Sequence, residues 1–319
     1  MENSLFRYRS VDKFEQELQA LTGSYIWFSK FKDLNDPMEA FHEIAVLGPV
    51  LSEIQSSIDE MEEISKDYSI CSLSKRMDNS MMWSLYADTH SGIAIEYDSA
   101  VLTDWLVDEN PLIKVHYSSD APKIFTDSGE IDNLVTLAIK MMATKHSDWS
   151  NEQEVRLIRR KDKQFYHHPD AIKGIYLGAN FSDDAKLYKI TNAAKRISKP
   201  IYKCLIDGYN VKSETIFEPE IKEHNVTIED RKEAKDSGIV LDIESLALAI
   251  RMAKNDKYCN KIVDLDVSDK DETGNTIFVI YKSNTIFSDN PAEQNVAQKM
   301  YFSCVQGVVK RVWGTRNMV

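Results

Sequence analysis

Short runs with the composition of β-strands alternate with segments of helical periodicity along the first two-thirds of the chain, and this alternation is what most constrains the fold. Strand-like runs are predicted at 25–29, 68–74, 92–98, 112–118, 154–160, 173–178 and 201–207. Helical periodicity is predicted over 10–23, 51–66, 81–88, 101–107, 130–145 and 183–197. Short strands broken by helices in this way predict an α+β domain, with a short-stranded mixed sheet as its core and helices around it.

The character of the chain changes after Asp207. Residues 208–238 are polar, charged and weakly patterned, which predicts a linker. Beyond it, 240–252 has strong helical periodicity, and IVDLDV and TIFVIYK on either side of DKDETGN predict a hairpin. A last amphipathic helix is predicted behind Asn290-Pro291, with an apolar face made by Val296, Met300, Cys304, Val308 and Val312. The prediction is therefore a domain at 1–207, a linker at 208–238 and a smaller α+β extension at 239–319.

The overall composition disfavours several classes of protein. The 319 residues carry a formal net charge of −12. Proteins that clamp duplex nucleic acid usually present a basic face, so sequence-independent duplex binding is disfavoured, while short basic clusters still allow a pocket for an anionic cofactor. No apolar run approaches a membrane span and the N-terminus lacks a secretion signal, so we expect a cytoplasmic protein without a membrane partner. The four cysteines are scattered and predict reduced thiols rather than disulfides or a zinc site.

Two glutamates, Glu152 and Glu154, lie two residues apart where the run EVRLIRR begins. Side chains two apart on a strand point to one face, so we expect both carboxylates on the same face as Arg156. Two like charges side by side repel each other, which costs free energy unless a group outside the strand compensates it. An exposed edge strand that carries charges against aggregation is one explanation. The alternatives are carboxylates that bind a metal, act as acid and base, or stabilise a cationic sugar.

Candidate ligand-binding residues in the N-terminal part each have an ordinary structural explanation beside the functional one. Arg7 and Arg9, in RYRS, can hold a phosphate or a carboxylate bidentately, or can lie on the surface. Ser29 follows an aromatic pair inside a predicted strand, where its hydroxyl can be buried. Asn35 and Asp36 precede a proline, and plain turn chemistry is the favoured explanation for both.

Three further candidates surround the predicted helix MMWSLYAD. Trp83 and Tyr86 are three residues apart, which puts both rings on one helix face, where they can pack a core or stack on a cofactor. His90 follows in a predicted loop and can act as a general base, although a lone loop histidine usually has no such role.

Four motifs together resemble a bacterial family known as domain of unknown function 2971. They are RYRS, WFSKFKDLNDP, CSLSKRMDNSMMWSLYAD followed by SGIAIEYD, and W..EQEVRLI, and they occur in the order and spacing of that family. The resemblance covers roughly the first 200 residues and leaves the C-terminal third uncovered. By itself it implies no activity.

Some of the same residues also resemble mono-ADP-ribosyltransferases of the arginine, serine, glutamate type. In that superfamily an arginine on the first strand is followed by an aromatic-serine strand and then by a turn of the form aromatic-x-x-(Gln/Glu)-x-Glu. This chain has Arg9, then Phe28-Ser29, then Trp149-Ser-Asn-Glu152-Gln-Glu154, in that order. The resemblance implies an ADP-ribosyltransferase-like fold for the catalytic domain at 1–207.

The resemblance implies catalytic roles for the two glutamates. Glu154 would hold the ribose 2′-hydroxyl of NAD and stabilise the positive charge that develops on the ribose when its bond to nicotinamide breaks. Glu152 would meet the incoming nucleophile, and a glutamate at this position is similar to enzymes that modify arginine. Trp149 would lie on the turn that touches the target.

The resemblance also implies an NAD-binding set. Arg9 would anchor the phosphates or the ribose, with Arg7 as the alternative anchor. Ser29 would support the nicotinamide pocket and orient the catalytic glutamate. Phe28 and Tyr86 are assigned to NAD binding together with these residues.

These resemblances lead us to expect an NAD-dependent mono-ADP-ribosyltransferase, acting as a bacterial toxin or phage-defence effector on a protein or nucleic acid acceptor. NAD would be the substrate and no metal would be needed, and an antitoxin or chaperone is the expected partner. A non-catalytic nucleotide-binding sensor or adaptor is the first alternative. A hydrolase or nuclease that gathers a divalent metal with Glu152, Glu154 and Asp36 is the second.

Overall fold

The computed structural model describes most of the chain: residues 3–39, 41–46, 51–104, 112–126, 133–160, 163–167, 169–219, 226–256, 259–268, 274–283, 298–305 and 308–312. The chain divides into two compact units, Met1–Pro219 (unit 1) and Glu220–Val319 (unit 2). Each unit combines helices with a sheet, so the fold is α+β, as the sequence predicts. No helix among the described residues is long and apolar enough to cross a membrane.

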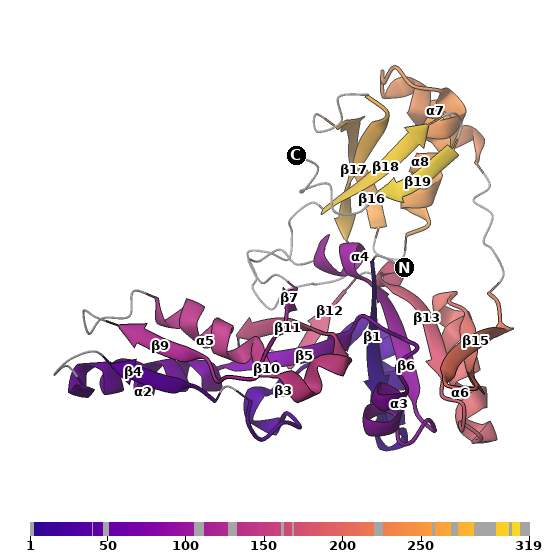
Figure 1. The fold of residues 1–319 in the computed structure, drawn as a ribbon. Helices are drawn as coiled ribbons and strands as arrows, with labels where there is room; N and C mark the ends of the chain where they lie inside the picture. Colours follow the sequence, from indigo (N-terminus) through magenta and orange to yellow (C-terminus); the bar gives the residue numbers. More distant parts are fainter. Residues whose placement is uncertain are drawn as a thin grey trace. The chain divides into compact units, whose positions relative to one another are not determined.

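Unit 1 is built on a nine-stranded sheet in the order β15-β14-β13-β6-β1-β5-β11-β7, with β3 beside β5 (Figure 1). The strands are β1 Ser4–Arg9, β3 Ser29–Lys30, β5 Tyr68–Ser74, β6 Ile93–Asp98, β7 Ile113–Lys114, β11 Glu154–Arg160, β13 Ile172–Leu177, β14 Ile201–Asp207 and β15 Asn210–Phe217. The β13–β14 pair is parallel and the other pairs are antiparallel, so the sheet is mixed as predicted.

The sheet divides in its middle, between β1 and β5. These neighbours share a single ladder pair, Phe6↔Ser74, whereas β1 pairs with β6 over its whole length and β5 pairs with β11 over its whole length. Figure 1 shows β1 and β6 running across the direction of β5 and β11. Because β1 and β5 separate after one pair, the residues of β1 that follow Phe6 pair with β6 but not with β5.

Three small strand pairs lie outside this sheet. They are β2 Tyr25–Trp27 with β12 Gln164–Tyr166, β4 Glu43–Val46 with β9 Lys123–Thr126, and β8 His116–Ser118 with β10 Thr144–His146. The predicted strand at 25–29 is therefore two strands, β2 and β3, which belong to different sheets. The predicted strand at 112–118 is likewise divided between β7 and β8.

The helices of unit 1 are α1 Phe14–Gly23, α2 Leu51–Lys66, α3 Ser80–Tyr86, α4 Ser99–Asp104, α5 Leu134–Met142 and α6 Asp184–Ile197. Short 3-10 turns are η1 Val11–Lys13, η2 Phe31–Asp33, η3 Ser147–Glu152 and η4 Pro169–Ala171. Side chains of Asn79, Asn133 and Asp183 accept backbone N–H groups where α3, α5 and α6 begin, which explains these boundaries. The predicted helix at 130–145 is shorter than expected, because Lys145 already belongs to β10.

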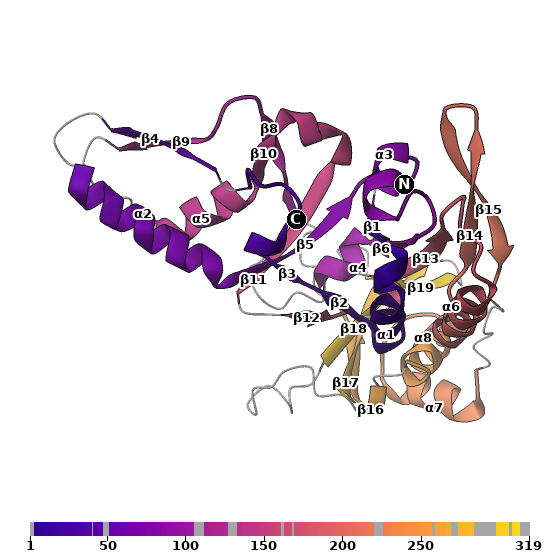
Figure 2. The same ribbon diagram turned by 90° about the horizontal axis from the view of Figure 1, so that it is seen from below.

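Helices α2 and α5 lie side by side and cover one end of β5 and β11 (Figure 2). Ile58 and Met61 of α2 pack with Met141 and Met142 of α5 and with Ile158 of β11 in one buried cluster. Burial of apolar side chains of this size stabilises a fold by roughly 1.5–3 kcal/mol each. The cluster therefore holds the α5–β10 segment firmly beside β11.

Unit 2 consists of α7 Ile228–Asp236, α8 Ile243–Lys254 and an antiparallel sheet of β16 Cys259–Val267, β17 Thr276–Ser283, β18 Gln298–Val305 and β19 Val308–Val312. Leu246 and Ile250 of α8 pack against Ile277, Val279 and Phe302 of the sheet. The predicted hairpin is confirmed as β16 and β17, which pair antiparallel.

Two predictions about the C-terminal third differ from the structure. The prediction of a last amphipathic helix is wrong where the structure describes the chain, since Met300, Cys304 and Val308 lie on strands β18 and β19. The predicted start of this helix at Asn290-Pro291 lies outside the described residues, and so does Val296. Residues 208–238 contain β15 of unit 1 and α7 of unit 2 rather than a simple linker. The polar composition of β15 reflects its place at the edge of the sheet.

Candidate functional site

A pocket of about 160 Å³ lies where β1 and β5 separate. Its walls include the ends of β1 and β5, the start of β11, the turn after β3, and Tyr86 of α3. Four cationic side chains line it, namely Arg7, Arg9, Lys145 and Arg156. Four acidic side chains line it as well, namely Asp33, Glu39, Glu152 and Glu154. A pocket so rich in charge is unusual for a structural cavity, which is normally apolar.

Most of the sequence-predicted site residues meet in this pocket. Arg9, Ser29, Tyr86, Glu152 and Glu154 all line it, although they come from β1, β3, α3, η3 and β11. Arg7 lines it too, so the alternative between the two arginines remains open. These residues converge because β1, β5 and β11 are neighbours in the sheet and β3 pairs with β5.

Two predicted residues lie elsewhere. Phe28 is buried between β2 and β3, packs against Phe165 with ring centroids 6.5 Å apart, and is not part of the pocket wall. Trp149 lies in η3 and lines a second pocket, of about 290 Å³, together with Met81 and Leu85 of α3. The two pockets share Glu152 and Met82.

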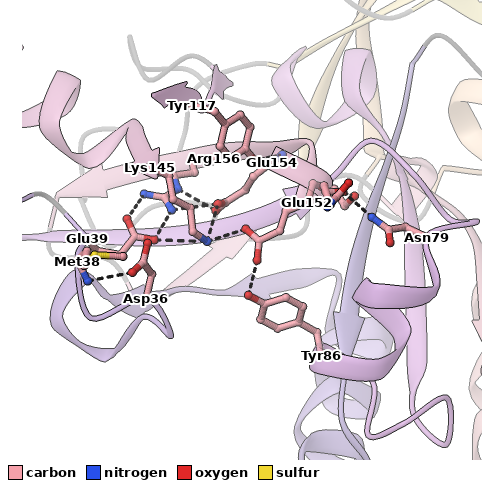
Figure 3. A network of polar contacts seen from close by, with 12 residues as sticks. Asp36, Met38, Glu39, Asn79, Tyr86, Tyr117, Lys145, Glu152, Glu154 and Arg156 are labelled. Carbon is pink, nitrogen blue, oxygen red and sulfur yellow. Dashed lines mark hydrogen bonds and ion pairs between the residues drawn. The ribbon is translucent and has the colours of Figure 1, made fainter. Parts of the chain in front are cut away.

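Glu154 and Arg156 lie on the same face of β11, as strand periodicity predicts, and they form a bidentate ion pair (Figure 3). The Arg156 Nε donates to Glu154 Oε1 at 2.8 Å, and Nη2 donates to Glu154 Oε2 at 3.0 Å. The far side of the same guanidinium donates to both carboxylate oxygens of Glu39, at 2.8 and 2.6 Å. Nη1 also donates to the backbone oxygen of Met142. All five N–H groups of Arg156 are therefore used.

Lys145 lies between three carboxylates (Figure 3). Its Nζ is 2.6 Å from Glu152 Oε2, 3.6 Å from Glu154 Oε2 and 3.7 Å from Glu39 Oε1. The lysine side chain is only 4% exposed, so water screens these interactions weakly. Its ammonium also lies 4.5 Å from the ring centroid of Trp149, within range of a cation–π interaction.

The position of Glu152 differs from the prediction in one respect. Glu152 ends the 3-10 turn η3 rather than lying on the strand, and Gln153 then adopts a left-handed conformation with φ of 45° before β11 begins. The turn is held by Ser74, whose hydroxyl donates to the backbone oxygen of Glu152 at 2.7 Å. The Glu152 carboxylate accepts hydrogen bonds from Tyr86 Oη and Lys145 Nζ. Both carboxylates thus line one pocket, but Glu152 reaches it from a 3-10 turn and not from the strand.

The structure also excludes the simplest explanation for the paired charges, an exposed edge strand. β11 lies between β5 and β7, and its first five residues, 154–158, are buried. A buried carboxylate without a partner would cost several kcal/mol, so Arg156 and Lys145 are needed if these acids are to remain charged.

The environments of the two glutamates push their pKa values apart. Burial raises the pKa of Glu152 above the usual glutamate value, and hydrogen bonds from Lys145 and Tyr86 offset this effect only in part. Burial also acts to raise the pKa of Glu154, but the charge and hydrogen bonds of Arg156, together with the charge of Lys145 and a hydrogen bond from Ser72, outweigh it, so the net pKa is lowered. Glu154 therefore stays ionised near neutral pH, whereas Glu152 holds a proton more readily. Such asymmetric pairs are typical of acid–base sites.

The arginine end of the pocket is braced from behind by Glu17 of α1. Arg9 Nε donates to Glu17 Oε2 at 2.9 Å, and Arg7 Nη1 is 3.8 Å from Glu17 Oε1. Arg7 also donates from Nη2 to the backbone oxygen of Trp27 at 2.7 Å. Arg7 is buried, while 25% of the Arg9 side chain is exposed, so Arg9 is the more accessible cation for a ligand.

Of the remaining candidates, Asn35 lines the pocket, whereas Asp36 and His90 have structural roles in the described contacts. Asp36 Oδ1 accepts the N–H of Met38 at 2.9 Å, which is the turn chemistry favoured from the sequence. His90 stacks on Trp83, lies 3.2 Å from the hydroxyl of Ser80, and is not part of the pocket wall. Among the residues described, no three His, Cys, Asp or Glu side chains are arranged to hold a metal ion.

Sequence reasoning missed three central members of this cluster: Glu39, Lys145 and, as a partner of Glu154, Arg156. Strand periodicity already placed Arg156 on the face of Glu154, and a buried cation there could have been inferred from the two like charges. Glu39 and Lys145 gave no such signal, because they approach from a turn and from the segment after a helix.

The comparisons with known proteins support part of this picture. The model of a family described as protein of unknown function (DUF2971) matches residues 82–157. The matched range includes Tyr86, Lys145, Glu152, Glu154 and Arg156 but none of the pocket residues before position 82. No curated protein and no solved structure matches the chain. The chain is thus similar to that family over part of the pocket, and the family description carries no activity.

Proposed function

We propose that unit 1 is an NAD-dependent mono-ADP-ribosyltransferase that modifies a macromolecule. The observation that supports this most is the convergence of Arg9, Ser29, Glu152 and Glu154 on one pocket. The sequence resemblance implied that these residues act together, and they come from three separate stretches of the chain: β1, β3 and the η3–β11 junction. A pocket lined by both cationic and acidic side chains suits a ligand with phosphates and a cationic nicotinamide ribose.

The proposed reaction breaks the bond between the ribose C1′ and the nicotinamide nitrogen. The electron pair of this bond leaves with nicotinamide. A nucleophile of the acceptor then forms the new bond to C1′ and releases its proton. Positive charge accumulates on the ribose in the transition state, so a carboxylate close to it accelerates the step. Glu154 is suited to this role because its pKa is lowered and it remains ionised.

Glu154 can serve this purpose although Arg156 holds both of its oxygens. A carboxylate offers about four lone-pair directions, so each oxygen can accept a further hydrogen bond from a ribose hydroxyl. Arg156 would keep the carboxylate from rotating, which lowers the cost of reorganisation during the reaction. Glu152, with its raised pKa, is the candidate that receives the proton of the acceptor.

The size of the pocket limits how NAD would bind. Its volume of about 160 Å³ is below the roughly 300–1,000 Å³ of pockets that enclose drug-sized ligands. We infer that it takes the nicotinamide ribose end, with the adenosine end lying outside. The acceptor, whether protein or nucleic acid, and an antitoxin or chaperone partner remain proposals that follow from the resemblance alone.

The test is release of nicotinamide from NAD by the full chain, with bacterial protein, RNA and DNA supplied as acceptors. Glu154→Gln keeps the shape of the side chain and removes its charge, so we expect nicotinamide release to fall about 100- to 1,000-fold. Glu15→Gln is the matched control, because its side chain is 60% exposed on α1. It should leave release unchanged.

Other outcomes would favour the other functions. If the chain binds NAD, seen as a rise in its melting temperature, but never releases nicotinamide, a nucleotide-binding sensor or adaptor becomes the better explanation. Cleavage of nucleic acid or another substrate that requires Mg²⁺ or Mn²⁺ and no NAD would favour a hydrolase.

A further inference from the structure

Carboxylates of the pocket converge on a buried lysine. Three of them, from Glu39, Glu152 and Glu154, approach the Nζ of Lys145 within 4 Å, at 3.7, 2.6 and 3.6 Å. Glu39 is distant in the sequence from Glu152 and Glu154, so it meets them only in the folded unit. The carboxylates of such a cluster repel one another unless a cation lies among them.

Arg156 alone does not neutralise this cluster. Its five N–H groups are used on Glu154, on Glu39 and on the backbone of Met142, so none is directed at Glu152. Among the described contacts, the charge of Glu152 is met by Lys145 and by the neutral hydroxyl of Tyr86. The cluster holds three carboxylates against two cations and has a formal charge of −1.

Lys145 is buried and held in place, unlike a flexible lysine on the protein surface. Its side chain is 4% exposed, it follows α5 on the short strand β10, and the indole of Trp149 covers its ammonium at 4.5 Å. An ammonium in this position is a point charge with three donors, enough for one to each carboxylate.

We propose that Lys145 is the built-in cation of this site, a positioning residue whose charge holds three converging carboxylates together. It holds the carboxylates of Glu152 and Glu154 in one orientation toward the pocket. The inference rests on the proposed function only in naming these glutamates as the catalytic residues. The position and charge of Lys145 can be tested without it.

The test replaces the ammonium by an uncharged side chain of similar length. Lys145→Met leaves the cluster with a formal charge of −2, so it should bind a divalent cation that the parent does not. We expect the melting temperature of this variant to fall by several degrees, and millimolar Mn²⁺ to restore much of that loss. Lys140→Met is the control, because Lys140 is an exposed lysine in the last turn of α5. Its melting temperature should neither fall nor rise on addition of Mn²⁺. A purely space-filling role for Lys145 would give no response to Mn²⁺.

A second variant covers the case in which Lys145→Met does not fold. Glu39→Gln combined with Lys145→Met returns the formal charge to −1, so the double variant should melt higher than Lys145→Met alone. The inference is overturned if Lys145→Met shows no Mn²⁺ response, or if Lys145→Met does not fold and the double variant is no more stable than it. We expect nicotinamide release to fall about 100-fold in Lys145→Met through misplacement of the glutamates. If even the parent releases none, the proposed function fails while the Mn²⁺ and stability results still decide the role of Lys145.

Discussion

Both units of the protein bury acidic side chains among cations, but the two clusters are built differently. In unit 2, Asp230 is fully buried and accepts bonds from Arg251 Nε at 2.7 Å and Lys254 Nζ at 3.0 Å. It also accepts the N–H and hydroxyl of Thr227 in the capping box that begins α7. In unit 1, three carboxylates share Lys145 and Arg156.

The difference shows how a structural ion pair can be told from a candidate site. Asp230 and Glu233 share two cations, Arg251 and Lys254, so acids and cations are equal in number, and those cations reach solvent, with 21% and 30% of their side chains exposed. The unit 1 cluster has an excess of acid, and its cations are 1% and 4% exposed. It also borders a pocket. The shortage of positive charge beside a pocket fits the ligand site proposed for unit 1, whereas the balanced cluster at the start of α7 fits a role in stability.

The largest effect that would test this comparison is expected from Arg156→Met. The change leaves Glu39 and Glu154 buried without their main partner, so unit 1 should lose about 3–5 kcal/mol of unfolding free energy. Arg160→Met on the same strand is the control, because that side chain is 65% exposed and its ion pair with Asp67 should contribute about 0–1 kcal/mol. Denaturant unfolding measures both. Equal losses would mean that the unit 1 cluster is no more tightly coupled than a surface pair.

A smaller loss, of about 1–3 kcal/mol, is expected for Asp230→Asn, which leaves buried donors poorly satisfied. The loss should be confined to unit 2, and nicotinamide release should not change. Asp236→Asn, at an exposed position near the end of α7, is the control. A change in NAD chemistry with Asp230→Asn would remove the distinction between a structural and a functional cluster.

The same residue predicts a pH dependence of stability. Burial acts to raise the pKa of Asp230, but hydrogen bonds from Thr227, Lys254 and Arg251 outweigh it and lower the pKa to about 2. A lowered pKa stabilises the folded state above the ordinary aspartate value of about 4, and this contribution is lost as the pH falls from there toward 2. Asp230→Asn should therefore flatten the stability of unit 2 over this interval, as measured by unfolding at a series of pH values.

The smallest effect is expected from Tyr86→Phe, which removes one donor from Glu152. Because Glu152 borders both pockets and keeps Lys145, water can replace the hydroxyl, and the stability loss should be about 1 kcal/mol. The loss of a donor to the charged form should raise the pKa of Glu152 further, moving the acid side of the nicotinamide-release profile to higher pH. Tyr188→Phe, a tyrosine 70% exposed, is the control. An unchanged pH profile would mean that the protonation of Glu152 does not control the rate of nicotinamide release.

Much of the local structure of unit 1 could be predicted, since period-two and period-3.6 patterns depend on neighbours in sequence. Helix α2 and strand β14 have the predicted bounds of 51–66 and 201–207. The C-terminal error has a physical reason as well. Met300, Cys304 and Val308 recur every four residues, a spacing that fits a helix face and equally fits every second inward position of a strand. Pairing of β18 with β17, together with burial of Phe302 in the cluster with α8, decides in favour of the strand.

The sequence by itself determined the α+β character, the arginines of β1, and the carboxylates that flank the start of β11, because these follow from residue type and local periodicity. Tertiary structure alone decided that they share a pocket, through the separation of β1 from β5 after one ladder pair. It also decided that Glu39 and Lys145 join them. A charge cluster assembled from a turn, a short strand and a sheet has no period in the sequence, because its members are neighbours only across space.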